Sequence, residues 1–456
     1  MTPTAGQARS VLLGLLAGAA LAGVFAWALS TNSYNLWGAV ILCPILVLVN
    51  VVLIRRVSHR RPEPWLAGLL ILAFAAKMAG TLVRYYVAYT VYDGTADAER
   101  YNLYAAYHFR AWREGVITWN LTSQRGTEYM ELITTAIYTV IGPTTLGAFV
   151  VYSSFAFWGA YLIFRAFQIA FPDGEHKRYA VLLFFLPSIL YWPSSIGKEA
   201  WLLLFVGATA LGAAKFFAHQ RGALTLLAVG ALGTAIIRPH IAVLLFASLL
   251  VAQLFRPATS HATGILLKVG GIVVMGLAAW VLTQQSAKFL GTDDISWQAI
   301  SESIDMAGGR TTQGGSQFDA VELTSPLGFP AAATTILFRP FPWEAGNVQL
   351  LVQSLEGALL LVLTVASWRR LRRLPGLLRG NPYLVFALTY AASFIVAFSG
   401  FANFGILARQ RVLMLPFFLV LLALPLRRKN ERDQAALERQ EREADDSPRA
   451  GVFKSV

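Results

Sequence analysis

The stretch LWGAVILCPILVLVNVVLI (residues 36–54) is followed at once by RRVSHRR (residues 55–61), and this junction decides how the chain is organised. The first part is apolar over about the length that a helix needs to cross a bilayer. The second part is a dense basic cluster, which the positive-inside rule places in the cytoplasm. The stretch therefore predicts a transmembrane helix and fixes the orientation of the spans that follow it.

The composition of the 456-residue chain points the same way, because 56% of the residues are hydrophobic and only 14% are charged. The net charge of +13 does not indicate nucleic-acid binding, since most arginines and lysines lie in short clusters between apolar runs, where they read as topology signals. The single cysteine, Cys43, excludes an intrachain disulfide. We predict an all-α, polytopic integral membrane protein without a soluble domain and without a nucleic-acid partner.

About twelve apolar runs predict transmembrane helices. They cover residues 11–29, 36–54, 65–91, 145–167, 180–192, 200–217, 223–237, 241–255, 264–282, 348–368, 382–399 and 412–426. The first run follows Arg9 and has a second interpretation, a cleaved signal peptide. The runs form one multi-pass domain over residues 1–426, and we expect the charged tail, residues 427–456, to be cytoplasmic and disordered.

Residues 129–141 are apolar over only about half of a spanning length and end at Gly142-Pro143, so we predict a re-entrant or interfacial segment there. Leaving this segment uncounted places the basic clusters and both termini in the cytoplasm, as expected in a cell membrane. It also gives two sizeable extracytoplasmic loops, residues 92–127 and 284–347. We therefore expect function on the outer face.

The first outer loop opens with YDGTADAERYNLYAAYHFRAWREG (residues 92–115), which places Asp93 and Asp97 where an apolar run ends. Helical spacing puts Asp97, Tyr101, Tyr104 and His108 on one face. A carboxylate there is a candidate general base for an acceptor hydroxyl, or a ligand of a divalent cation such as Mg²⁺ or Mn²⁺. The other interpretation is a helix N-terminus at which either aspartate favours the dipole.

Several cations are predicted on the outer face, against the positive-inside rule. The arginines among them are Arg238, Arg310, Arg339, Arg409 and Arg411, and His240 and Lys198 lie in the same outer turns. Arginine forks bind phosphate oxygens in bidentate fashion, so this placement indicates an anionic ligand such as a polyprenyl phosphate or diphosphate. For Lys198 and Glu199, an internal ion pair with a snorkelling lysine is the alternative.

The second outer loop and the third run add further candidates. LFRPFPWEAGN (residues 337–347) carries Trp343 and Glu344; the ring of Trp343 could stack on a sugar or anchor at the membrane interface. GGRTTQGGSQF (residues 308–318) lacks the spacing of a P-loop and predicts a flexible loop that could cover a site. Lys77 and Arg84 lie inside the third run, where a charge should face a protein interior or a water-filled cavity.

Three stretches carry a resemblance to known families. DAERYNLYAAYHFRAWREG (residues 97–115) resembles the acidic first outer loop of GT-C-type glycosyltransferases. PSILYWPSSIGKEA (residues 187–200) and NFGILARQRVLMLP (residues 403–416) are similar to segments of Wzy-like and EpsG-like polysaccharide polymerases. Two predicted spans precede the span that leads into the acidic loop, whereas GT-C enzymes usually place that loop after their first span.

The resemblance implies an enzyme of cell-envelope glycan assembly that takes a sugar or oligosaccharide from a polyprenyl-linked donor and joins it to a glycan acceptor on the outer face. It implies that Asp97 is the base or metal ligand, and that Arg238, Arg409 and Arg411 hold the lipid diphosphate. Membrane lipids and other envelope assembly proteins would be its partners. A flippase or transporter for a lipid-linked saccharide, with Lys77, Arg84 and Arg238 along its pathway, is the second hypothesis, and a non-catalytic scaffold is the third.

Overall fold

The computed structural model describes residues 5–117, 125–256, 262–290, 316–319, 321, 323 and 327–426. In chain order its elements are α1 (Ala5–Ser30), α2 (Tyr34–His59), α3 (Leu66–Tyr86), η1 (Val87–Val91), α4 (Asp97–Arg113), α5 (Arg125–Ile141), α6 (Thr145–Ala170), α7 (His176–Phe185), α8 (Pro187–Tyr191), α9 (Lys198–Phe217), α10 (Ala223–Ile237), α11 (Pro239–Leu254), α12 (Ala262–Leu290), α14 (Gly328–Phe338), η2 (Pro342–Glu344), α15 (Val348–Ala366), α16 (Trp368–Leu371), α17 (Leu374–Leu378), α18 (Pro382–Phe398), α19 (Phe404–Arg411) and α20 (Leu415–Leu422). Over these residues the predicted all-α class is confirmed. Arg310 and the tail, residues 427–456, lie outside them.

Among the described residues, five helices are long and apolar enough to cross a membrane, judged by length and composition. They are Tyr34–His59, Leu66–Val91, Thr145–Ala170, Lys198–Phe217 and Val348–Ala366. A sixth arises if α19 and α20, which meet at an angle of 65°, form one broken span. The structure agrees with a membrane protein, and the predicted number of about twelve spans remains a prediction.

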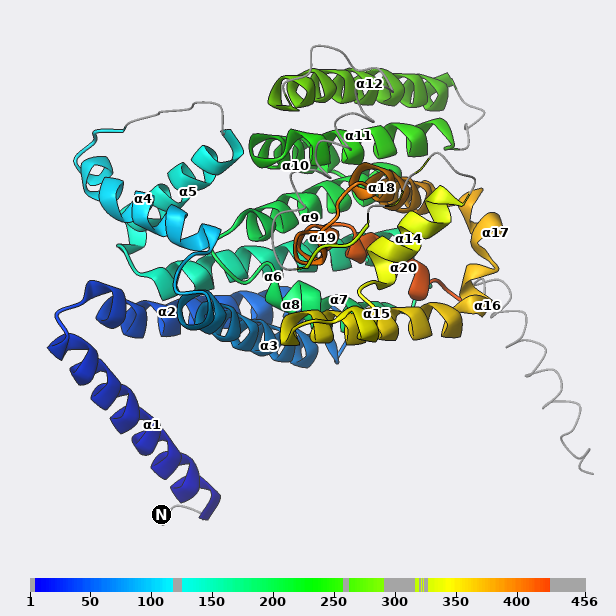
Figure 1. Ribbon diagram of the computed structural model, residues 1–456. Coiled ribbons are helices and arrows are strands. Elements are labelled where there is room, and N and C mark those ends of the chain that lie inside the picture. The colour runs from blue at the N-terminus through cyan, green and yellow to red at the C-terminus, as the bar shows by residue number, and fades with distance from the viewer. Residues whose placement is uncertain are drawn as a thin grey trace, which may run out of the picture.

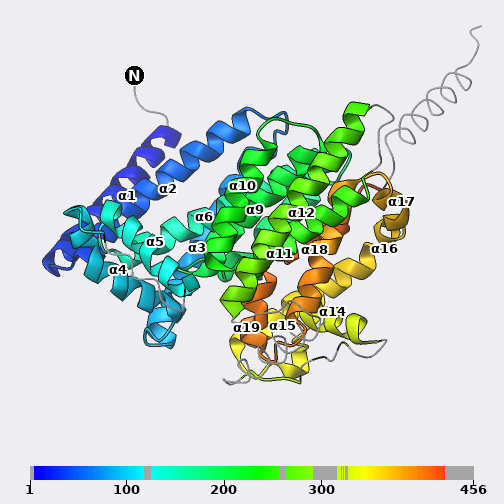
Figure 2. The ribbon, with the colours of Figure 1, turned by 90° about the horizontal axis from the view of Figure 1, so that it is seen from above.

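The centre of the bundle is the pair α6 and α9, which lie side by side in Figure 1. A Cβ added at Gly207 would come within 2.3 Å of the Gly159 carbonyl oxygen, so the two backbones touch where neither residue has a side chain. Small residues allow this close approach between membrane helices. α2 and α3 flank α6 on one side, and α10, α11 and α12 are stacked beyond α9 on the other (Figures 1 and 2).

α4 and α5 form a helical hairpin at the side of the bundle (Figure 2). The Arg100 Nε donates to the Glu131 Oε1 at 2.8 Å and so links the two helices. The predicted short segment at residues 129–141 is the greater part of α5, which begins at Arg125. It buries polar as well as apolar side chains, Thr134 and Thr135 among them.

The local structure differs from the sequence-based expectation in two places. The predicted span at residues 180–192 is two short helices, α7 and α8, because Pro187 has no N–H and holds Leu186 in an extended conformation with ψ of 124°. The predicted loop at residues 284–347 contains the helix α14, and α12 continues into it as far as Leu290. The eleven residues of α14 are too few to be recognised as a span from hydropathy.

Candidate functional site

The acidic stretch is positioned by an irregular turn at the end of a membrane helix. α3 passes into η1, a π-helical segment in which the Tyr92 N–H bonds the Val87 carbonyl at 3.0 Å. Asp93 and Gly94 then take positive φ angles of 44° and 72°, which reverse the chain into α4. Asp97 is the first residue of α4, in the turn where the helix dipole favours a carboxylate. π-helical segments are frequent at functional sites.

Asp97 belongs to a chain of charged side chains that comes from four helices. The Arg409 Nη2, on α19, lies 2.9 Å from the Asp97 Oδ2. The same guanidinium reaches Glu199 at the start of α9, with 3.1 Å from its Nε to the Glu199 Oε1. The Arg238 Nη2, at the end of α10, lies 3.2 Å from that oxygen. Residues 97, 199, 238 and 409, far apart in the sequence, therefore form one network.

The network is buried at one end and open at the other. The side chain of Glu199 is 2% exposed and that of Arg238 is 13% exposed, whereas that of Asp97 is 57% exposed. The Arg238 guanidinium also donates to the Gln410 side chain, which anchors α10 to α19. Two arginines thus share one buried glutamate, and Arg409 extends from it toward the accessible carboxylate of Asp97.

Three more of the predicted site residues lie around this network. The Lys198 Nζ donates to the Thr127 Oγ1 at 2.9 Å, so the start of α9 is tied to α5. His240, two residues after Arg238, lies within electrostatic range of Arg238 and Lys198. Burial raises the pKa of the Tyr101 phenol, and the negative charges of Asp97 and Glu199 raise it further. Tyr101 therefore stays protonated at neutral pH and can act as a hydrogen-bond donor.

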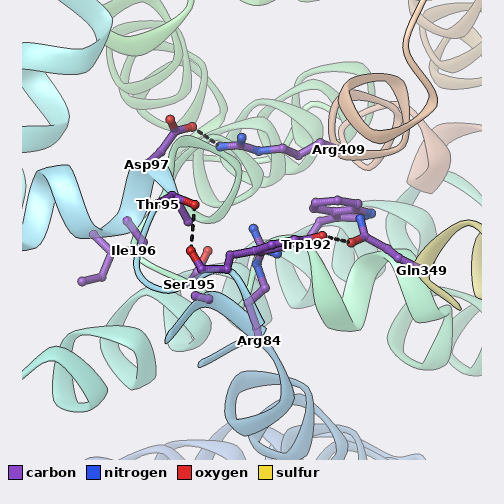
Figure 3. Close-up of a pocket in the computed structure, with 12 residues that line it drawn as sticks. Arg84, Thr95, Asp97, Trp192, Ser195, Ile196, Gln349 and Arg409 are labelled. Atoms are coloured by element: carbon purple, nitrogen blue, oxygen red, sulfur yellow. Dashed lines mark hydrogen bonds and ion pairs between the residues drawn. The ribbon is translucent and has the colours of Figure 1, made fainter. Parts of the chain in front are cut away.

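A polar cavity of about 280 Å³ opens beside the Asp97–Arg409 pair (Figure 3). Its lining comprises Arg84, Ala88, Tyr92, Thr95, Ala96, Asp97, Ala98, Trp192, Ser195, Ile196, Gln349 and Arg409. From the sequence, Arg84 was named as a charge inside a span and as a pathway residue of the flippase hypothesis. In the structure it rises from α3 toward the same cavity (Figure 3). The cavity therefore has an arginine on two of its walls.

A larger groove of about 670 Å³ adjoins the cavity. Its lining comprises Val83, Val87, Val91, Tyr92, Pro187, Ser188, Tyr191, Trp192, Asn347, Val348, Gln349, Val352, Gln353 and Glu356. Tyr92, Trp192 and Gln349 line both spaces, and the Tyr92 Oη donates to the Gln349 Oε1 at 2.8 Å. The groove runs between α3, α8 and α15, and valines form much of its wall. A polar cavity and an apolar groove thus meet at these shared residues.

Arg411 faces away from the charged network although it is only two residues from Arg409. Its side chain is 1% exposed, and its Nη2 lies 3.2 Å from the Glu356 Oε1. Its Nη1 donates to the Arg339 carbonyl at 3.0 Å. Helical residues i and i+2 point in different directions, so one helix cannot present both arginines to one ligand. The structure places Arg411 in the packing around Glu356, apart from Arg409.

The other predicted residues also lie apart from the cavity. Arg339 pairs with Glu344 on the η2 side, its Nε lying 3.0 Å from the Glu344 Oε1. Burial alone would raise the pKa of Glu344, but hydrogen bonds from Arg339 and the Phe341 N–H outweigh it and lower the pKa. Trp343 is 81% exposed. Asp93 lies in the turn before α4 and is not among the residues that line the cavity or the groove.

The described residues form no group of three or more His, Cys, Asp or Glu side chains that could hold a metal ion. Asp97, the predicted ligand, is instead paired with Arg409, whose positive charge opposes a cation beside it. The candidate Mg²⁺ or Mn²⁺ therefore has no assigned site among these residues.

Sequence reasoning missed several polar residues of the site: Thr95, Thr127, Ser195, Gln349 and Gln410. Gln410 lies between two predicted arginines in the RQR motif (residues 409–411), so its position in the sequence could have indicated that it belongs to the site. The other four are uncharged residues in loops or helix ends. Nothing in their local sequence distinguishes them from ordinary surface residues.

Comparison with models of known protein families, with curated proteins and with solved structures returned no significant match to this chain.

Proposed function

We propose that this protein is a membrane glycosyltransferase or polysaccharide polymerase that uses a polyprenyl-phosphate- or diphosphate-linked sugar donor. The observation that carries the proposal is the junction of an arginine-lined cavity, which holds an accessible carboxylate, with an apolar groove. An anionic headgroup attached to a long hydrocarbon matches both spaces at once, because guanidinium groups bind phosphate oxygens and apolar walls bind the chain.

Asp97 is the candidate general base in this proposal. It would accept the proton of an acceptor hydroxyl while that oxygen attacks the anomeric carbon of the donor sugar. The bond from this carbon to the phosphate oxygen breaks, and the phosphate or diphosphate leaves as an anion stabilised by arginine. Arg409 bonds Asp97 in the structure. A phosphate that engages Arg409 would compete for this contact and release the carboxylate for proton transfer.

Glu199 and Arg238 hold Arg409 in position for its contact with the leaving phosphate. Glu199 accepts from both Arg238 and Arg409, and so holds the guanidinium of Arg409 at the edge of the cavity. A fixed orientation of the donor groups lowers the reorganisation needed when charge develops on the leaving group. Lys198 is next to Glu199 at the start of α9, and His240 is two residues after Arg238 in the first turn of α11, so both lie close to the charged network.

The proposal places the site on the extracytoplasmic face of the cell membrane. It keeps about twelve spans, with both termini in the cytoplasm, as the charge distribution of the sequence predicts. The acceptor would be a growing glycan, and other envelope assembly proteins would be partners.

The flippase hypothesis has less support from the geometry. Lys77, one of its three pathway residues, is 3% exposed and donates from its Nζ to the Ile189 carbonyl at 2.9 Å. This lysine therefore stabilises the end of the short helix α8. Arg238 is likewise engaged by Glu199 and Gln410.

The first experiment measures transfer from a polyprenyl-linked saccharide by the purified protein in nanodiscs, comparing wild type with Asp97→Asn and Arg409→Ala. We expect product from the wild type and a loss of about a hundredfold or more in Asp97→Asn, as expected for removal of a general base. Arg221→Ala, in a loop distant from the network, is the control for loss of a positive charge. Normal transfer by both site variants would refute the proposal, and lipid movement without glycosidic change would favour the flippase.

A further inference from the structure

The guanidinium of Arg84 has a hydrogen-bond donor that the described residues do not satisfy. Arg84 is 9% exposed and lies in the membrane helix that continues from α3 into η1. Its Nη1 donates to the Tyr191 Oη at 3.0 Å, and its charge lies over the rings of Tyr191 and Trp192 at 4.9 and 5.1 Å from their centroids. Its Nε has no hydrogen-bond partner among the described residues. No carboxylate in the described part of the chain forms an ion pair with Arg84. A buried charge in a membrane helix that lacks such a partner indicates a ligand.

The surroundings of Arg84 identify the chemistry of that ligand. Arg84 and Arg409 line the same cavity, and the only carboxylate in this lining, Asp97, is already paired with Arg409. The lining therefore carries one more positive than negative charge. An anion with several oxygen acceptors would satisfy it, as a phosphate does.

The groove decides whether this anion is free or attached to a lipid. It begins at Tyr92, Trp192 and Gln349, the residues that it shares with the cavity. Along α3 and η1 its wall is Val83, Val87 and Val91, about one residue per helical turn. The carboxylate of Glu356 at its far end is already held by Arg411 and by the hydroxyl of Ser188 at 2.6 Å.

We propose that a lipid phosphate or diphosphate binds with its phosphate between Arg84 and Arg409 and its hydrocarbon chain in the groove between α3 and α15. Arg84 is then a ligand-contacting residue that the outer-face prediction did not include. The inference rests on the proposed function, since it concerns the donor of that reaction, but it makes a claim about binding that needs no turnover.

The headgroup half is tested by binding of undecaprenyl phosphate, farnesyl phosphate and inorganic phosphate to the full-length protein in nanodiscs of zwitterionic lipid. Arg84→Gln should weaken all three about ten- to a hundredfold, as expected for the loss of a charged hydrogen-bonding partner. Arg221→Gln removes a guanidinium from the loop before α10, which lines neither the cavity nor the groove, so it should retain binding. Equal losses in both variants, or none in Arg84→Gln, would overturn the assignment of Arg84.

The chain half is tested with two valines of α15. Val352 lines the groove and Val362 does not, and they are 48% and 63% exposed. Val352→Trp should weaken undecaprenyl phosphate at least about tenfold and leave inorganic phosphate unchanged, whereas Val362→Trp should affect neither. Unchanged binding of the long-chain probe to Val352→Trp would place the chain elsewhere.

Gln353 distinguishes a plain hydrocarbon from a chain that carries polar groups. It lines the groove, is 4% exposed, and neither atom of its amide has a partner among the described residues. Gln353→Leu should retain or strengthen undecaprenyl phosphate binding, and a loss would point to an acyl chain with an ester or amide. If the binding pattern holds but no sugar is transferred, the inference stands and the proposed function fails.

Discussion

At the scale of single residues, Glu199 is the charge on which the site depends. It is almost fully buried and pairs with two guanidinium groups, those of Arg238 and Arg409. We expect Glu199→Ala to lower the free energy of unfolding by about 3–5 kcal/mol, because it leaves buried positive charge uncompensated. Thermal unfolding in detergent measures this. Asp97→Ala, which removes an exposed carboxylate from the same arginine, should cost far less, and equal losses would contradict this account.

The residue types at this site could be predicted, but their pairings could not. Arg238 and Arg409 were selected because cations on the outer face run against the positive-inside rule. Asp97 was selected because it lies where an apolar run ends, and Glu199 because it lies in a turn between apolar runs. The structure brings all four together. Arg411 was selected by the same rule and is a packing residue of Glu356. The rule counts charge, and it cannot tell which side of a helix each arginine faces.

At the scale of elements, the contact between α6 and α9 sets the position of Glu199, because Glu199 lies at the first turn of α9. A side chain at Gly207 would collide with the Gly159 carbonyl. Gly207→Val should therefore destabilise the protein by about 1–3 kcal/mol, the usual cost of overpacking, and reduce transfer through displacement of α9. Thermal unfolding and donor turnover are the measurements.

Gly276→Val on α12 is the control for this prediction, because a Cβ added there meets nothing within 4 Å. If both substitutions destabilise equally, the close approach of α6 and α9 is not the cause. The long helices themselves were predictable from apolar runs, whereas the break at Pro187 and the helix α14 were not. Hydropathy is averaged over a window of residues. The average therefore does not reveal the break at a single proline, and it does not detect a helix of eleven residues.

At the scale of the whole molecule, the orientation in the membrane decides whether the site lies on the extracytoplasmic face. Cys43 is the only cysteine, so a Cys43→Ala protein is a background for labelling introduced thiols. In intact cells, Tyr107→Cys on α4, which is 82% exposed in the wild type, should react with a membrane-impermeant maleimide. Gln220→Cys, in the loop before α10, should react only after permeabilisation. The reverse pattern would move the site to the cytoplasmic face and refute the proposed topology.

The RQR turn of α19 has a further consequence. Within one helical turn, Arg409 meets the charged network, Gln410 meets Arg238, and Arg411 meets the glutamate that borders the groove. Three consecutive residues therefore connect the polar cavity, which binds the phosphate, with the apolar groove, which binds the hydrocarbon. A small molecule that couples a phosphonate to a short branched hydrocarbon would engage the cavity and the groove at once and should act as a competitive inhibitor, whereas either fragment alone should compete more weakly.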